Sequence, residues 1–155
     1  MQLEEFQVLF KEHYTAIKNF LYYKIGDADM SEDIAQDAFM KLWEKRDEVN
    51  TETVKSYLYT IANNMMLNKI RHNKVVMTFA EKQKTHKDEQ SPHYNLEEKE
   101  FKQELERVIS EMPEKQRVVF LMNRMDEMTY KEIAERLDLS VKAIEKRMHG
   151  ALNHL

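Results

Sequence analysis

The sequence of 155 residues contains no cysteine and only two glycines and two prolines. Without cysteine, the chain has neither a disulfide framework nor a thiolate metal site. So few turn-forming residues argue against a fold of many short strands, whereas 42% hydrophobic and 34% charged residues suit amphipathic helices. We therefore predict an all-α fold.

Long apolar runs are also missing from the sequence. No stretch of about 18 consecutive apolar residues occurs. Residues 1–6 carry two acids and no apolar run of signal-peptide length. We expect a cytoplasmic protein without membrane insertion.

The sequence lacks the motifs of common catalytic and metal sites. Its six histidines form no pair at the i,i+4 spacing of a helical metal site, and no HExxH, glycine-rich phosphate loop or nucleophile elbow occurs. We expect no cofactor, no metal site and no enzymatic activity.

Apolar residues recur every three or four positions in several segments, which predicts a series of helices. In the first half, Gly26 should end the first helix, Ser31 should cap the second, and the third should cover about residues 54–72. The apolar positions of the first two are Phe6, Leu9, Phe10, His13, Ile17, Phe20 and Leu21, and then Ile34, Ala35, Ala38, Phe39, Leu42 and Trp43.

The periodicity fades over residues 81–94, a polar stretch that cannot bury enough apolar surface to order itself. This predicts two small helical domains, residues 1–75 and 96–155, joined by a flexible linker over 76–95. In the second domain a helix should start near Leu96 and stop before Pro113, followed by another over 114–125. The apolar positions of the first of these are Phe101, Leu105, Val108 and Ile109.

Residues 129–152 have the pattern of a helix-turn-helix. Thr129 and Glu132 fit a capping box, and Ser140 can cap the second helix. Ala134 should lie where the two helices cross, and Leu139 should fill the corner between them. The predicted core positions of the second helix are Val141, Ile144, Met148 and Leu152.

The other side chains of this second helix predict a DNA-reading surface, although a plain αα-hairpin would share the helical pattern. Lysine and glutamate can read guanine and cytosine edges in the major groove, and lysine or arginine can hold phosphates. The candidate DNA-binding residues here are Lys142, Glu145, Lys146, Arg147 and His149.

The net charge of −4 is unevenly distributed along the chain. Residues 26–52 carry nine acids and three bases, whereas residues 53–80 carry four bases and no acid. Cations, flat rings and amides are what single-stranded DNA requires of a binding surface. The candidates on the basic helix are Tyr59, Asn63, Asn64, Asn68, Lys69 and Arg71; the alternative is a solvated face with Tyr57 in the core.

Several ordered motifs resemble sigma factors of the extracytoplasmic-function (ECF) class of the sigma-70 family. The acidic segment SEDIAQDAF at residues 31–39, followed by Leu42 and Trp43, is similar to the ECF signature, and YLYTIANN at 57–64 is similar to the promoter-melting helix. MPEKQR at 112–117 and YKEIA at 130–134 resemble the family's second domain. The chain departs from the family pattern at Asn63 and Gly150, where relatives often carry basic residues.

This resemblance implies a transcription initiation factor that binds core RNA polymerase, through its clamp and flap regions, and promoter DNA. An anti-sigma factor is a further expected partner. The first domain would bind the polymerase and the minus-ten element, and the second would read the minus-thirty-five element. The implied polymerase-binding residues are Asp33, Gln36, Asp37, Phe39, Leu42 and Trp43; core packing competes for the last three.

The resemblance also implies that Asn64 and Asn68 meet an unstacked promoter strand. The main alternative function is a stand-alone helix-turn-helix regulator whose first helices serve for dimerisation or sensing. A weaker one is a helical interaction protein without a DNA role. The reversal from an acidic to a basic helix favours a sigma factor, which needs separate surfaces for protein and DNA.

Overall fold

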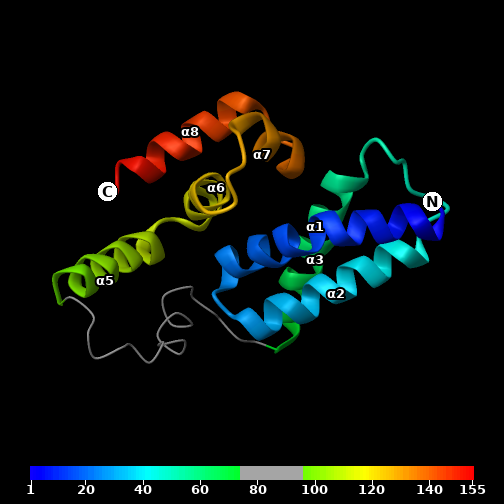
Figure 1. Cartoon of the computed structure of the whole chain (residues 1–155), viewed down its shortest axis with the longest axis horizontal. Coiled ribbons are helices and arrows are strands. Elements are labelled where there is room, and N and C mark those ends of the chain that lie inside the picture. The colour runs from blue at the N-terminus through cyan, green and yellow to red at the C-terminus, as the bar shows by residue number, and fades with distance from the viewer. Residues whose placement is uncertain (74–95) are drawn as a thin grey trace.

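The computed structural model describes residues 1–73 and 96–155, and this part of the chain is helical without any strand, as predicted (Figure 1). The predicted linker over 76–95, including its polar stretch, lies outside the described residues. The helices are α1 (Leu3–Ile25), α2 (Ala28–Glu44), α3 (Val54–Asn73), α5 (Leu96–Glu111), α6 (Glu114–Arg124), α7 (Tyr130–Leu137) and α8 (Val141–Leu152).

Glycine ends α1, as the sequence predicts. Gly26 adopts the left-handed conformation with φ of 70°, and its N–H donates to the carbonyl of Tyr22 at 2.7 Å. A residue without Cβ enters this region at little steric cost and can satisfy the last carbonyls of a helix. The chain therefore reverses direction here and leads directly into α2.

The predicted cap of α2 is wrong by one helical turn. Asp27 is the N-cap, and its carboxylate accepts the backbone N–H of Met30 at 3.1 Å. Ser31 lies inside the helix, fully buried, and its hydroxyl donates to the carbonyl of Asp27 at 2.7 Å. Both residues favour cap positions, and the one nearer to Gly26 begins the helix.

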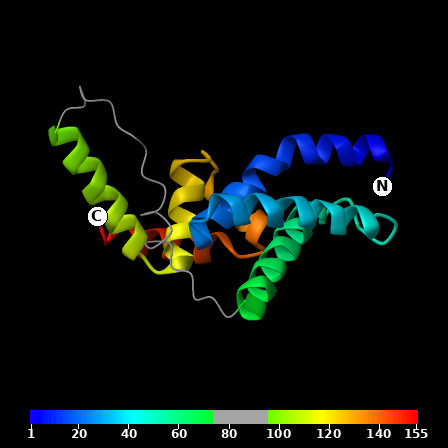
Figure 2. The same ribbon diagram turned by 90° about the horizontal axis from the view of Figure 1, so that it is seen from below.

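Helices α1, α2 and α3 share one core. Aromatic rings join α1 to α2, since Phe39 contacts Phe10 at 4.9 Å and Phe6 at 6.2 Å between ring centroids. The two helices run side by side in both views (Figure 1, Figure 2). The largest fully buried side chains of this unit are Phe39, Ile17, Leu21, Ile25, Ile34, Leu42, Leu58 and Met66.

Helices α7 and α8 form the predicted helix-turn-helix, and α6 packs against both. Thr129 and Glu132 make both hydrogen bonds of a capping box, and the Ser140 hydroxyl accepts the N–H of Ala143 at 3.1 Å. Asp138 turns the chain in the left-handed region with φ of 56°, and the N–H of Leu139 returns to the carbonyl of Ala134 at 2.9 Å. Each of these features follows from its local sequence signal.

Two predicted core positions of α8 are wrong. Val141 is 41% exposed and Leu152 is 40% exposed, whereas Ile144 and Met148 are buried as predicted. Val141 and Leu152 are the first and last residues of α8, where the neighbouring helices no longer cover the surface. Ala151 takes the core position in the last turn instead.

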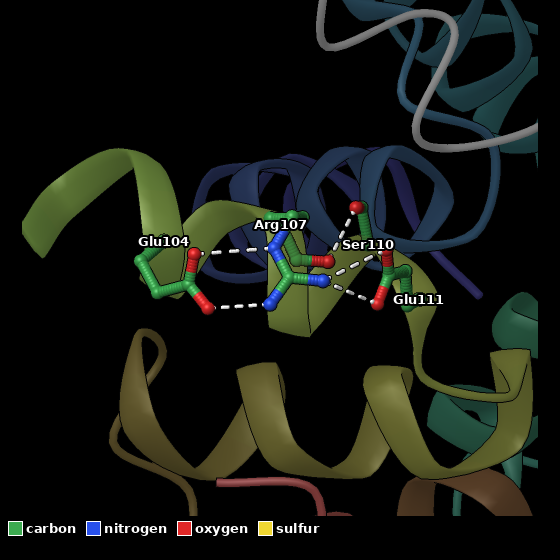
Figure 3. Close-up of polar contacts among 4 residues, drawn as sticks. All are labelled: Glu104, Arg107, Ser110 and Glu111. Atoms are coloured by element: carbon green, nitrogen blue, oxygen red, sulfur yellow. Dashed lines mark hydrogen bonds and ion pairs between the residues drawn. The ribbon is translucent and has the colours of Figure 1, made fainter. Parts of the chain in front are cut away.

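Few residues of the other helices pack against the apolar face predicted for α5. Phe101 is 71% exposed, and α5 projects from the other helices, with only Val108 and Ile109 near its end packed against the core (Figure 2). Arg107 bridges Glu104 and Glu111 along the helix surface (Figure 3). Ion pairs at i,i+3 and i,i+4 spacing support a helix that lacks tertiary packing, although exposed pairs contribute little each.

The two helical units pack against each other, α6 on α1 and α7 on α3. Arg117 of α6 is buried and donates from Nε to the carbonyl of Tyr23 at 2.7 Å and from Nη2 to that of Lys24 at 3.0 Å. These carbonyls belong to the last turn of α1, where the helix dipole favours a cation. Arg117 therefore ties the second unit to the end of α1.

Candidate DNA and polymerase interfaces

The outer face of α8 carries four of the five residues predicted to read DNA. Lys142, Glu145, Lys146 and His149 are exposed and recur at three- and four-residue steps, so they share one face of the helix. The core side of the same helix is fixed by Ile144 and Met148. This arrangement can present charged and polar groups to the major groove while the helix stays anchored.

The fifth residue, Arg147, points elsewhere. It is half-buried and lines a pocket together with Lys24 of α1 and Glu114 of α6. The packing of the two units therefore places Arg147 inside the molecule and away from the outer face of α8. Whether it holds DNA phosphates stays a prediction.

A second polar stripe runs along α3. Asn64, Asn68 and Arg71 are exposed, at i, i+4 and i+7, and Lys69 is half-buried beside them. Thr60 and Leu67 share this face, and Leu67 is 46% exposed. Sequence reasoning missed both, although their spacing from Asn64 and Asn68 would have placed them on the same face.

Tyr59, predicted as a DNA contact, is buried with only 3% of its surface exposed. Its ring packs edge-on against Phe20 of α1 at 5.0 Å, and Arg136 and Leu137 of α7 line the same pocket as Tyr59. Tyr57, which the alternative placed in the core, is half-buried and packs against the core. In this arrangement the Tyr59 ring cannot stack on a base.

Asn63 is also engaged inside the molecule. Its side-chain oxygen accepts a hydrogen bond from Lys24 Nζ at 2.6 Å. The amide is half-buried, whereas the neighbouring Asn64 is exposed. The adjacent asparagines thus have different surroundings, and only Asn64 is open to a DNA strand in this arrangement.

The exposed face of α2 is acidic. Asp33, Gln36 and Asp37 are all exposed, and Ser31, Ile34, Ala35 and Ala38 form the buried side of the helix. Met40 continues the exposed face and is 64% exposed. An apolar side chain beside carboxylates can provide buried contact area at a protein interface, and sequence reasoning missed it.

Phe39 and Leu42, predicted as polymerase contacts, lie in the core, which is the competing alternative for both. Phe39 is 2% exposed and packs against Phe6 and Phe10 of α1, and Leu42 is fully buried. Trp43 is half-buried, with Phe6 at 5.0 Å on one side and the guanidinium of Arg46 at 4.1 Å from its ring centroid. Its remaining surface is available to a partner.

Buried polar groups line the contact between the units. Asp126 accepts hydrogen bonds from Tyr23 Oη at 2.7 Å and Asn19 Nδ2 at 3.1 Å. Burial raises the pKa of Asp126, and the two hydrogen bonds partly oppose this. Burial lowers the pKa of His13, and the positive charge of Arg136 lowers it further.

The described ranges hold no cluster of three or more histidine, aspartate or glutamate side chains that could bind a metal ion. Among the helices described, none is long and apolar enough to cross a membrane. The candidate binding surfaces are the exposed faces of α2, α3 and α8.

An acidic helix, a basic helix and a helix-turn-helix define a helical DNA-binding protein with a separate surface for a protein partner. Residues 9–75 match sigma-70 region 2, and residues 102–155 match sigma-70 region 4. The first match covers α2, α3 and most of α1, and the second covers α6, α7 and α8.

Curated relatives match along most of the chain. The ferric citrate uptake sigma factor FecI of Escherichia coli is 27% identical over 96% of this chain and 87% of its own length. The ECF RNA polymerase sigma factor SigW of Bacillus subtilis is 27% identical over 86% of this chain and 77% of its own. The RNA polymerase sigma factor YlaC of Bacillus subtilis is 25% identical over 92% and 85%.

Solved structures share the fold. The sigma factor RpoE in a complex with the anti-sigma factor NepR from Bartonella quintana has a TM-score of 0.66 at 18% identity, covering 98% of this chain and 94% of that chain. CnrH in a complex with the cytosolic domain of CnrY has a TM-score of 0.63 at 20% identity, covering 99% and 86%. The chain belongs to the sigma-70 family and, within it, to the ECF class of sigma factors.

This membership decides between the functions left open by the sequence. A stand-alone regulator would need only the helix-turn-helix, whereas the chain carries region 2 as well as region 4. The protein is therefore a transcription initiation factor, as the sequence motifs predicted.

Proposed function

We propose that this chain binds core RNA polymerase through the exposed face of α2 and directs it to promoters through α3 and α8. Asp33, Gln36 and Asp37, together with Met40 and the open part of Trp43, would contact the polymerase clamp. The role is one of binding and requires no catalysis by this chain. Because polymerase and promoter DNA are cytoplasmic, the protein would act in the cytoplasm.

The observation that carries this proposal is the separation of charge between adjacent helices. The exposed residues of α2 carry five acids and one base, Lys41, whereas the exposed stripe of α3 contains amides and Arg71 and no acid. DNA phosphates would repel the face of α2, and a basic protein surface would attract it. One face therefore suits a protein and the other suits a nucleic acid.

On α3, Asn64 and Asn68 would hydrogen-bond the edges of promoter bases, and Lys69 and Arg71 would contact the backbone. Unstacking a base costs a few kcal/mol, which such hydrogen bonds must offset. Tyr59, packed on Phe20, and Asn63, bonded to Lys24, could join this site only after these contacts with α1 open and the second unit moves away. On α8, Lys142, Glu145, Lys146 and His149 would read duplex DNA, and Arg147 would reach phosphates after the same movement.

The proposed domains are residues 1–75 and 96–155, joined by residues 76–95. The first domain would bind the polymerase clamp and the minus-ten element of the promoter. The second domain would bind the polymerase flap and the minus-thirty-five element. An anti-sigma factor is the further partner that we propose. Among proteins of similar fold, the sigma factor RpoE was solved with the anti-sigma factor NepR, and CnrH was solved with the cytosolic domain of CnrY.

The polymerase contact is tested by reversing the charge of the α2 face, with Asp33→Lys and Asp37→Lys together. Both side chains are exposed, so their replacement opens no cavity and stability should change by no more than about 0.5 kcal/mol for each. Like charges against a basic clamp should weaken binding to core polymerase by on the order of a few kcal/mol. An affinity titration and a thermal melt measure the two effects separately.

Reversing Glu4 and Glu5 provides the matched control, because both are exposed acids on α1 and the change in net charge is the same. This control should retain most of the affinity for polymerase. Equal affinity of the α2 variant and the wild type would contradict the clamp contact. A collapsed melt of the α2 variant would show that Asp33 and Asp37 act in folding.

A further inference from the structure

A pocket of about 260 Å³ lies between the two units, with walls from both. The first unit contributes Lys24 and Tyr59, and the second contributes Lys115, Arg136 and Arg147. Glu114 is the acid among the pocket's lining residues. The lining therefore carries four basic side chains and one acid, which leaves it strongly positive.

Lys24 is the basic group most affected by this arrangement. Its Nζ lies 4.9 Å from the centroid of the Phe20 ring and donates to Asn63 Oδ1 at 2.6 Å. Burial lowers the pKa of Lys24, and Arg147 and Lys115 lower it further, while Glu114 acts in the opposite direction. Burial and the neighbouring cations therefore disfavour the charged form of Lys24 in this pocket.

Two donors in the pocket lining also have no partner within the described ranges. These are the Tyr59 hydroxyl and Arg136 Nε, both buried. The side chain of Arg136 is 11% exposed, and its contact with Glu135 uses Nη1 at 3.4 Å, which leaves Nε unused. Buried donors are ordinarily hydrogen-bonded, so these two require an acceptor.

We propose that this pocket binds a small phosphate-type anion. Tyr59 and Arg136 would donate hydrogen bonds to its oxygens, and Lys24, Lys115 and Arg147 would neutralise its charge. A guanidinium and an ammonium are the usual protein partners of phosphate. The volume lies below the usual range of roughly 300–1,000 Å³ for organic ligands, so the pocket suits a small ion or a single phosphate group.

Because both units contribute to the site, the anion stabilises their packed arrangement. A ligand that binds one arrangement shifts the population toward it. In the packed arrangement α7 lies on α3, and Tyr59 and Asn63 line the pocket between the two units. If the proposed function is correct, bound phosphate therefore also withholds part of α3 from promoter DNA.

The test uses the full chain without polymerase. Thermal melts in sodium phosphate are compared with melts in sodium chloride at the same pH and ionic strength, and calorimetric titration with phosphate gives the Kd. At ten times the Kd, phosphate should raise the Tm by roughly 3–6 °C beyond the chloride value. Lys115→Glu, an exposed change in the lining, and Arg136→Met, which keeps apolar volume, should each remove most of this rise.

Lys131→Glu is the matched control, because Lys131 is an exposed lysine of α7 that does not line the pocket. It should retain the phosphate response. The proposal is overturned if the wild type responds equally to phosphate and chloride, or if Lys131→Glu loses the response as fully as Lys115→Glu. Since no polymerase or promoter is present, this result is independent of the proposed function.

Discussion

Replacing Arg117 with methionine should loosen the contact between the two units. The guanidinium of Arg117 donates to three buried or half-buried carbonyls, those of Tyr23, Lys24 and Met112, at 2.7, 3.0 and 3.2 Å. Methionine has a similar length and fills much of the space, so the main loss is of hydrogen bonds. The first two of these join the second unit to α1.

A hydrogen bond from a charged donor contributes about 1.5–3 kcal/mol, and a carbonyl left without a donor costs about 1–3 kcal/mol. Removing the guanidinium also removes the cost of burying its charge, which offsets part of the loss. Burial lowers the pKa of Arg117, which reflects that cost. We expect a net loss of about 2–4 kcal/mol in the free energy of unfolding, a fall in Tm of roughly 5–15 °C.

The assay is a thermal melt together with amide hydrogen exchange at the end of α1. Arg124→Met is the matched control, because Arg124 lies on the same helix and is exposed, with its guanidinium 5.8 Å from the Phe120 ring. The control should change stability by about 0.5 kcal/mol or less. If Arg117→Met melts like Arg124→Met and exchange at the end of α1 is unchanged, the assigned role of Arg117 is refuted.

Three further substitutions have defined outcomes. Thr129→Ala removes the capping box and should cost about 1 kcal/mol in urea unfolding, whereas no change would mean that α7 is held by packing alone. Gly150→Ala should stabilise by up to about 1 kcal/mol, because the new Cβ meets only the flexible end of Gln116; a loss would show that Gln116 cannot move. Burial lowers the pKa of His13, Arg136 and Lys55 lower it further, and Glu12 acts in the opposite direction. The neutral His13 therefore contributes its full stability above pH 6.5, and this contribution is lost as the pH falls. His13→Gln should therefore flatten the fall of Tm on acidification, and identical slopes would contradict this.

Helix ends marked by local signals were predictable from the sequence. Gly26, the capping box at Thr129 and the cap at Ser140 depend on residues within a few positions, and the structure has all three. The cap of α2 was placed one turn late because Asp27 and Ser31 both suit a cap. Local chemistry alone does not decide between two such residues.

Burial that depends on a distant partner was not predictable. The pattern of α5 is amphipathic, yet no described helix covers Phe101. Tyr57 and Tyr59 look alike in the sequence, and packing of α1 and α7 against α3 decides that Tyr59 is the buried one. Arg117 was noticed within a family motif, but its contacts with α1 arise only when residues 93 and 94 positions apart meet.

The candidate surfaces were predicted in part for the same reason. Helical spacing places Asp33, Gln36 and Asp37 on the exposed side of α2 and the polar residues of α8 on its outer face. Spacing does not show that Arg147 turns toward Lys24, because that depends on how the two units pack.

Promoter-directed transcription by core RNA polymerase measures directly whether this chain acts as a sigma factor. The full chain is added to core polymerase on templates with a candidate promoter or a scrambled one, and specific transcripts are measured. We expect specific transcripts only when chain, core polymerase and intact promoter are together, and weak binding of the chain alone to promoter duplex. Tight sequence-specific binding by the chain alone, with no transcript gained from core polymerase, would contradict it.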